Sequence, residues 1–217
     1  MRTYNICRRL LFWFSFLALP FFIPTATAAD QPAPFVEKPI TRALFNQLRS
    51  GGYVLYMRHG NTDKSRPDRA PQVDLNDCST QRPLTAEGRE LAARVGKYIR
   101  ESKIPVGEVL SSPLCRAKES AEATFGRYDV ELNLMYSGNM TDAEKLPVNR
   151  KTRELLSKPV PANSTRFIVA HAPNLMDVMG YFPKIEGTVV VFRPAGEQGF
   201  EYLGSIAPEQ WQGLLQK

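Results

Sequence analysis

Short apolar runs alternate along the chain with longer stretches whose apolar residues repeat at helical spacing. The short runs, rich in β-branched and aromatic residues, predict strands at residues 53–57, 106–111, 167–170, 189–192 and 200–206. Helical spacing predicts helices at residues 41–50, 113–125, 141–156, 175–179 and 208–215, and another that begins at Thr85 and carries Leu91, Val95 and Ile99 on one face. Strands separated by helices predict an α/β fold, a three-layer α/β/α sandwich with a mostly parallel central sheet. The last two strands leave room for an antiparallel edge.

Two of the predicted strands end at a histidine. The run at 53–57 leads into Arg58-His59-Gly60 and then a polar loop over residues 61–82, and the run at 167–170 ends at His171. Ligands of open α/β sheets bind beyond the carboxyl ends of the strands. One histidine at a strand end is more often structural than catalytic, but these are the two histidines of the whole chain. Their shared placement favours a functional site.

The first 28 residues have the pattern of a secretory signal peptide. Three arginines precede an apolar stretch at 10–23, and Ala26-Thr27-Ala28 offers a cleavage site before Ala29. The alternative is an uncleaved membrane anchor, for which the apolar stretch is short. Residues 29–39, rich in proline, are expected to form an exposed lead-in, and residues 40–217 a single domain.

Removal of this segment changes the charge of the chain. It carries three of the 28 basic residues and none of the 22 acidic ones, so the net charge falls from +6 to +3. A charge this small gives no reason to expect a nucleic-acid partner. The sequence has no glycine-rich dinucleotide loop, no P-loop and no His or Cys spacing typical of a metal site, so we expect neither a cofactor nor a metal.

Three segments of the chain, in order, resemble the histidine phosphatase superfamily, the phosphoglycerate-mutase-like group. They are Arg58-His59-Gly60 after the first strand, residues 112–117 (Ser-Pro-Leu-Cys-Arg-Ala) after the second, and the late strand that ends at His171. The resemblance covers about residues 52–206. It implies a phosphoglycerate-mutase-like fold and a phosphate pocket formed by Arg58, His59, Arg116 and His171, with His59 as the nucleophile.

These residue types suit attack on a phosphate monoester. The ester is largely a dianion near neutral pH, and the forked guanidinium groups of Arg58 and Arg116 match its oxygens. A histidine is readily neutral at pH 7, so His59 can attack through one ring nitrogen and form a phosphohistidine that water hydrolyses. The other nitrogen needs a partner, for which the carbonyl of Gly60 or a neighbour could serve. His171, if protonated when substrate is bound, would stabilise the transferring phosphoryl group.

Two further residues are expected to bind substrate. Asn61 follows the Arg-His-Gly segment, as in the family, and Arg82 lies in the segment before the helix that begins at Thr85. For Arg82 a solvated surface charge is an equal alternative.

The proton donor for the leaving group is the weak point of the resemblance. The aromatic-Glu-Gly pattern of many members is absent, and Ala172 follows the late histidine where a second branch has Asp. Asp142, Glu144 and Glu186 are the candidates, although a helix cap or first-turn charge is the simpler interpretation of Asp142. A missing acid would restrict the enzyme to good leaving groups.

The cysteines fit export. Cys7 leaves with the signal segment, and Cys78 and Cys115 flank the expected site from two sides. An even number of cysteines in an oxidising compartment predicts a disulfide between them, two buried thiols being the alternative.

Together these features predict an exported, metal-independent phosphomonoesterase of the bacterial periplasm, with no stable membrane anchor after signal cleavage. Some exported relatives remove phosphate from the heptose of the lipopolysaccharide core, which makes a phosphorylated envelope glycan the leading substrate and a general scavenging phosphatase the alternative. A protein of the same fold that binds phosphate or glycan without turnover is the competing hypothesis.

Overall fold

The computed structural model describes residues 34–216 of the chain. The predicted signal peptide, residues 1–28, therefore lies outside the described residues. Within the described part, no helix is both long and apolar enough to cross a membrane.

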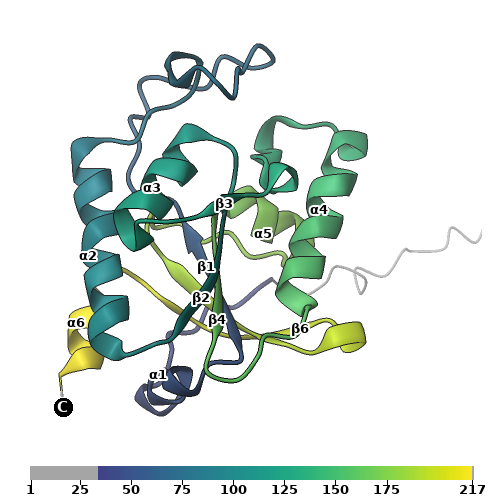
Figure 1. Cartoon of the computed structure of the whole chain (residues 1–217). Coiled ribbons are helices and arrows are strands. Elements are labelled where there is room, and N and C mark those ends of the chain that lie inside the picture. Colours follow the sequence, from purple (N-terminus) through teal and green to yellow (C-terminus); the bar gives the residue numbers. More distant parts are fainter. Residues whose placement is uncertain (1–33, 217) are drawn as a thin grey trace, which may run out of the picture. The chain divides into compact units, whose positions relative to one another are not determined.

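A six-stranded mixed sheet forms the middle of the fold, in the order β3-β2-β4-β1-β5-β6 (Figure 1). The strands are β1 (Tyr53–Arg58), β2 (Val106–Ser111), β3 (Asp129–Val130), β4 (Thr165–Ala170), β5 (Val189–Pro194) and β6 (Phe200–Ile206). The first four strands in this order run parallel, and β5 and β6 are antiparallel to their neighbours. The mostly parallel sheet with an antiparallel edge is therefore confirmed.

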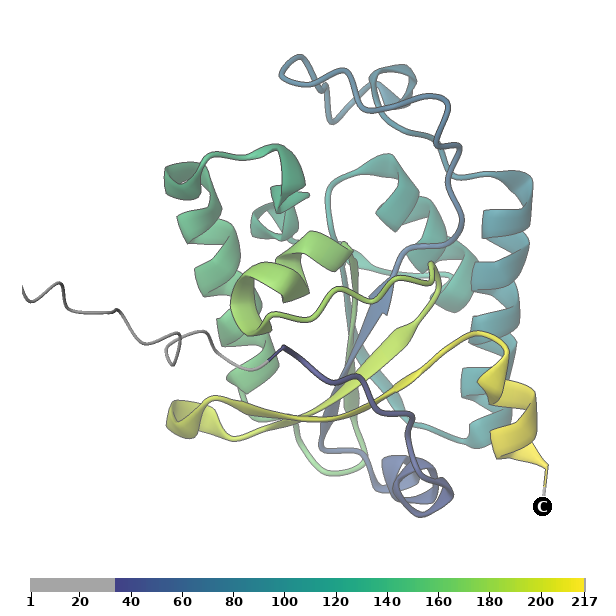
Figure 2. The same ribbon diagram turned by 180° about the vertical axis from the view of Figure 1, so that it is seen from behind.

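Helices cover both faces of the sheet (Figures 1 and 2). They are α1 (Arg42–Gln47), α2 (Ala86–Ser102), α3 (Cys115–Phe125), α4 (Asp142–Ser157), α5 (Ala172–Met179) and α6 (Gln210–Leu215). One core joins α1, α2, α3 and α6 to the sheet, and a second core joins α4 and α5 to the opposite face. The predicted three-layer α/β/α sandwich is confirmed.

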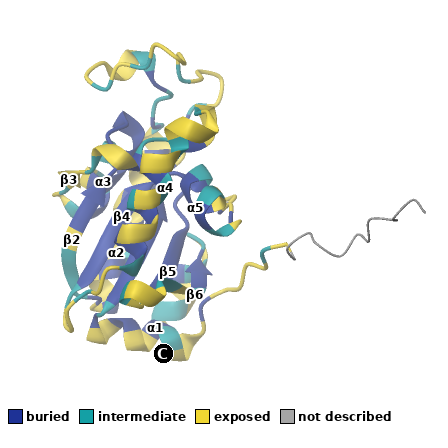
Figure 3. Ribbon diagram, turned by 90° about the vertical axis from the view of Figure 1, so that its right-hand side faces the viewer, coloured by how far each residue is buried: buried dark blue, intermediate teal, exposed yellow. Residues whose placement is uncertain are grey.

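Burial follows the alternation of side chains along the strands. On β1, Leu55 and Met57 belong to the first core, whereas Val54 and Tyr56 belong to the second. All six residues of β1 are buried, as expected for a central strand covered on both sides. Buried residues also make up most of the sheet between the helices in Figure 3. The central strands β1, β4 and β5 accordingly consist mostly of apolar runs.

Local sequence signals set where the helices begin. The Thr85 side chain accepts a hydrogen bond from the Gly88 amide at the start of α2, and Leu91, Val95 and Ile99 are buried on its inner face, as predicted. Helix α5 begins at Ala172, earlier than the predicted residue 175, because proline is well tolerated in the first turn of a helix. The predicted helix at 113–125 begins two residues later, at Cys115.

Residues 34–39 of the predicted lead-in are described. They are exposed except for Phe35, which stacks on Tyr181 with ring centroids 4.6 Å apart and meets Tyr202 edge-on at 4.9 Å. A β-bridge from Pro39 to Ser205 ties this segment to β6. The segment is thus anchored at both ends.

Candidate active site

The carboxyl ends of β1, β4 and β2 are neighbours in the sheet. The register pairs Arg58 with Ala170, so the residues that follow, His59 and His171, leave the sheet side by side with ring centroids 5.3 Å apart. The segment after β2 brings Arg116 to the same edge in the first turn of α3. The four residues predicted for the phosphate pocket therefore lie together.

His59 is buried, and a hydrogen bond to one of its ring nitrogens determines which tautomer the ring adopts. Its Nδ1 lies 2.8 Å from the carbonyl oxygen of Gly60. A carbonyl only accepts, so Nδ1 carries the hydrogen and Nε2 carries the lone pair. Burial, followed by the positive charge of Arg116, holds the pKa of His59 well below its ordinary value of 6.5, so the ring is neutral at pH 7.

Close backbone packing fixes the loop that carries His59. A Cβ on Gly60 would lie 2.3 Å from the Gly88 carbonyl oxygen, and a Cβ on Gly88 would lie 2.1 Å from that of Asn61. The Gly60 amide donates to Ser120 Oγ at 2.9 Å. The two glycines allow the loop after β1 to lie directly against the first turn of α2.

His171 is held from both its backbone and its ring. Its amide donates to Tyr56 Oη at 3.0 Å, while that hydroxyl donates to the His171 carbonyl at 2.8 Å. Its Nε2 lies 2.7 Å from Ser112 Oγ, and its Nδ1 is buried without a partner among the described residues. Burial, then the charge of Arg116, lowers the pKa of His171 well below its ordinary value.

Arg116 is fully buried and only partly paired. Its Nη1 donates to Asp68 Oδ1 at 2.8 Å, whereas Nε and Nη2 have no partner in the described part of the chain. The ring of Tyr136 faces its guanidinium at 5.2 Å from the centroid. Burial lowers the pKa of Arg116, and the Asp68 carboxylate opposes this effect.

Arg58 is fixed by acceptors along one side of its guanidinium. Nη1 donates to the carbonyls of Pro183 at 2.8 Å and Lys184 at 2.6 Å, and Nη2 donates to Glu186 Oε1 at 3.2 Å. Its Nε is buried and has no partner among the described residues. This N–H can therefore donate to an acceptor on a ligand.

The two predicted substrate-binding residues are placed differently. Arg82 is half-buried, and its buried Nε has no partner within residues 34–216. Its charge contributes to lowering the pKa values of both His59 and His171. This placement favours the pocket over the solvated surface for Arg82. Asn61 is exposed, and its carbonyl accepts from the Thr85 amide at 2.9 Å.

None of the three proton-donor candidates has a hydrogen bond to His59, His171 or Arg116 in the described part of the chain, although Glu144 lines a cavity beside Tyr136. The Glu144 carboxylate accepts from the amide and hydroxyl of Thr141, which makes a capping box and lowers the pKa of Glu144. Asp142 is exposed in the first turn of α4. Glu186 is buried and bound by Arg58, and it accepts from the amide and hydroxyl of Thr62, so it positions Arg58.

The structure adds Asp68, which the sequence did not single out. It lies in the long loop after β1, with its side chain 8% exposed, and it also accepts from the Arg82 amide at 2.8 Å. This loop extends beyond the edge of the sheet at which β1 ends (Figure 1).

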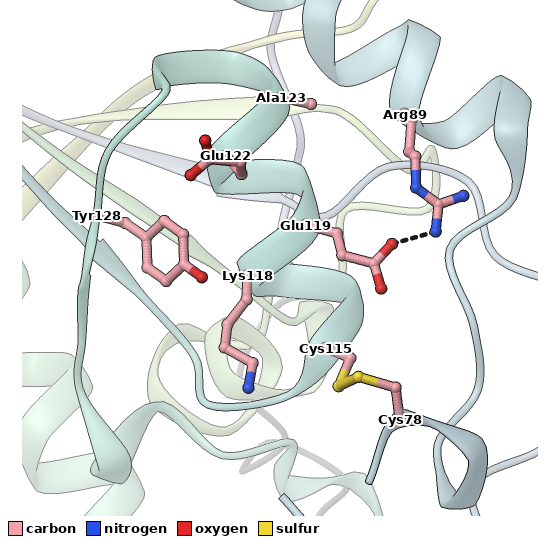
Figure 4. Close-up of a pocket in the computed structure, with 8 residues that line it drawn as sticks. All are labelled: Cys78, Arg89, Cys115, Lys118, Glu119, Glu122, Ala123 and Tyr128. Atoms are coloured by element: carbon pink, nitrogen blue, oxygen red, sulfur yellow. Dashed lines mark hydrogen bonds and ion pairs between the residues drawn. A yellow bond between two sulfur atoms is a disulfide. The ribbon is translucent and has the colours of Figure 1, made fainter. Parts of the chain in front are cut away.

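A disulfide joins the long loop to α3. Cys78 and Cys115 are bonded, with their Cα atoms 5.7 Å apart, which confirms the predicted bridge (Figure 4). The Cys115 amide also donates to Gln81 Oε1 at 2.7 Å. The bridge and this hydrogen bond hold the loop beside Arg116, the next residue in α3.

Comparisons with known proteins agree with this geometry. The sequence profile of the histidine phosphatase superfamily (branch 1) matches residues 54–136. The fold is similar to that of the protein histidine phosphatase SixA in complex with tungstate, with 16% sequence identity and a TM-score of 0.51; the match covers 73% of this chain and 98% of that chain. It is also similar to a phosphoserine phosphatase from Entamoeba histolytica (13% identity, 72% and 98%, TM-score 0.51). A search of curated proteins found no significant match.

The profile covers the strand that leads to His59, the long loop, the helix with Arg116, and Tyr136, while the fold similarity extends over most of the chain. The resemblance seen in the motifs is confirmed as far as these comparisons reach: residues 54–136 match the histidine phosphatase superfamily, and the fold is that of phosphatases of the phosphoglycerate-mutase-like group.

Proposed function

We propose that this protein is a phosphomonoesterase that acts without a metal through a phosphohistidine on His59. The observation that carries the proposal is the ring of His59, whose Nδ1–H is held by the Gly60 carbonyl so that Nε2 is left with a free lone pair. Around it are unpaired buried donors from Arg58, Arg82 and Arg116. A neutral nucleophile among cationic donors suits attack on a phosphate dianion.

Binding of the phosphate group would engage these donors. Its oxygens accept from Nε of Arg58, Nε of Arg82, and Nε and Nη2 of Arg116. When Ser112 donates to Nε2 of His171, the Nδ1 of His171 carries a hydrogen that can bond to a phosphate oxygen as well. The negative phosphate also raises the pKa of His171, so that this ring takes up a proton and stabilises the transferring group.

The chemical steps then follow in order. His59 Nε2 attacks phosphorus, the bond from phosphorus to the leaving oxygen breaks, and phosphohistidine forms with Nδ1–H still bonded to Gly60. Water attacks the phosphohistidine, the N–P bond breaks, and inorganic phosphate leaves. The paired arrangement of His59 and His171 at 5.3 Å allows one ring to attack while the other stabilises charge.

We further propose that the enzyme is exported and acts on a phosphorylated sugar of the cell envelope, such as the heptose phosphate of the lipopolysaccharide core. The signal-like pattern of residues 1–28 supports export, and the Cys78–Cys115 disulfide is typical of an oxidising compartment. Cell fractionation tests location, since mature protein in the cytoplasm would contradict export. Release of phosphate from purified lipopolysaccharide tests the substrate, with intact lipopolysaccharide as the contradicting result.

A binding protein without turnover is the competing function, motivated by the missing acid of the family pattern. The deciding assay is hydrolysis of p-nitrophenyl phosphate by the mature protein in EDTA. We expect turnover, its loss in His59→Ala, and unchanged turnover in Lys97→Gln, whose exposed side chain pairs only with Glu101 on α2. Phosphate binding without any turnover would favour the binding protein.

A further inference from the structure

We infer that Asp68 is the residue that donates a proton to the leaving group. The inference rests on the proposed phosphatase function and supplies the acid that function lacks. It comes from the contact of the Asp68 carboxylate with Arg116 and from the cavity that begins beside that contact.

Asp68 is the one carboxylate in the described part of the chain that touches Arg116. Its Oδ1 accepts from Arg116 Nη1 and from the Arg82 amide, each at 2.8 Å. The side chains of Arg116 and Asp68 are 0% and 8% exposed. Asp68 therefore binds the same guanidinium that the phosphate must use.

Asp68 lines a cavity of about 250 Å³. Its walls include Asp68, Pro71, Leu114, Met135, Tyr136 and a second carboxylate, that of Glu144. The Tyr136 ring faces Arg116 at 5.2 Å and His171 at 5.5 Å, so this cavity adjoins the phosphate pocket. The leaving group of a bound phosphomonoester would extend into it, which places Asp68 beside the bond that breaks.

We infer that Asp68 becomes protonated when substrate binds. A phosphate dianion competes with the single negative charge of the carboxylate for Arg116, and it has oxygens for Nη1 as well as for the unpaired Nε and Nη2. The displaced carboxylate then faces the phosphate, and two neighbouring anionic groups bind a proton from solvent between them. Asp68 in this state is a carboxylic acid at the leaving oxygen.

Asp68 gives up one proton in the first chemical step and takes one up in the second. As His59 Nε2 bonds to phosphorus, the electron pair of the breaking P–O bond goes to the leaving oxygen, which takes the Asp68 proton. In the second step, water gives its proton to the Asp68 carboxylate as its oxygen bonds to phosphorus and the N–P bond breaks. Asp68 then loses that proton to solvent when phosphate departs and pairs again with Arg116.

Three contacts keep Asp68 within reach after its release. The Arg69 amide donates to the Thr80 carbonyl at 2.9 Å, and the Cys78–Cys115 bridge fixes the same loop to α3. The Arg82 amide remains as a donor to the carboxylate. Glu144 lines the same cavity, but its carboxylate accepts from the amide and hydroxyl of Thr141 in the capping box and does not contact Arg116 in the described part of the chain.

The test compares Asp68→Asn with Asp63→Asn, a matched change in the same loop. Among the described residues, the Asp63 carboxylate bonds to Ser65 and to no residue of the pocket. Each variant is assayed on p-nitrophenyl phosphate, whose leaving group needs no proton, and on glycerol 2-phosphate, whose alkoxide does. We expect Asp68→Asn to lower kcat on glycerol 2-phosphate by about 100-fold or more but on the aryl ester by only a few-fold. Asp63→Asn is expected to change neither rate, and Asp68→Glu to recover part of the rate on the alkyl ester.

Two results would overturn the inference. An equal decrease of kcat for both esters in Asp68→Asn would mean that Asp68 only shapes the site. Unchanged turnover of glycerol 2-phosphate with a lower KM would mean that Asp68 only competes with substrate for Arg116. The His59→Ala variant tests the phosphatase function separately. If the proposed function is correct, this variant loses hydrolysis of both esters, whatever the role of Asp68.

Discussion

Acid should weaken the fold of this protein through its two histidines. Both rings are fully buried, and burial together with neighbouring arginines holds the pKa of each well below 6.5. In the unfolded chain each has an ordinary pKa near 6.5, so between these values the unfolded state binds more protons than the folded state. The stability that the neutral rings contribute is therefore present above about pH 6.5 and is lost as the pH falls.

The size of this loss follows from proton linkage. On acidification from about pH 7 to about pH 5.5, each histidine that stays neutral in the fold costs about 1.2 kcal/mol, or about 2.5 kcal/mol for His59 and His171 together. The chain has two histidines in all, and most carboxylates titrate below this range. The interval from about pH 5.5 to about pH 7 therefore reports almost entirely on these two rings.

Urea unfolding of the mature protein, followed by circular dichroism at both pH values, measures this difference. His59→Gln and His171→Gln each remove one titrating group, so each should reduce the pH-dependent loss by about half. Equal stability of the unchanged protein at both pH values would show that the histidines take up protons in the fold as readily as in the unfolded chain, and would refute the reasoning. A loss that persists undiminished in both variants would assign the effect to other groups.

Further predictions concern the disulfide, the glycine contact and the phosphate-binding arginine. Replacement of Cys78 and Cys115 by Ser removes a disulfide between residues 37 positions apart. We expect the free energy of unfolding, measured by urea titration, to fall by about 4 kcal/mol. Equal urea midpoints for the protein with and without the disulfide would contradict this prediction. Gly60→Ala places a Cβ 2.3 Å from the Gly88 carbonyl oxygen. We expect this substitution to lower the free energy of unfolding by about 2 kcal/mol or more and to slow the turnover of an aryl phosphate. Unchanged stability and turnover would show that the loop can move away from Gly88. Arg116→Ala should lower kcat by at least about 100-fold and weaken inhibition by inorganic phosphate, and a normal rate in steady-state assays would remove Arg116 from the pocket.

The central part of the site was predictable because it follows strand ends. Apolar runs of β-branched and aromatic residues specify β1 and β4, and parallel pairing brings the ends of both to one edge, so His59 and His171 had to meet. Even the Gly60 carbonyl was expected as a partner of His59. Strand β3 escaped prediction because two residues carry no recognisable alternation.

Other contacts could not be predicted because they depend on the path of loops. Nothing in the polar stretch after β1 distinguishes Asp68 from its neighbours, and its contact with Arg116 arises only when that loop folds back over α3. Glu186 pairs with Arg58 because the segment between α5 and β5 returns to the end of β1, where the Gly187 amide donates to the Arg58 carbonyl. Glu144 is different, since the capping box from Thr141 to Glu144 is visible in the sequence and already accounts for its carboxylate.

The most direct test of this account is detection of covalent phosphate on the protein. Mature protein is mixed with p-nitrophenyl phosphate, quenched within the first turnover, and analysed by mass spectrometry of its peptides at alkaline pH, where phosphohistidine survives. We predict one phosphoryl group on His59, absent in His59→Ala and retained longer in variants that slow the hydrolysis step. Turnover with phosphate on another residue, or undiminished turnover in His59→Ala, would contradict the assignment of His59 as the nucleophile.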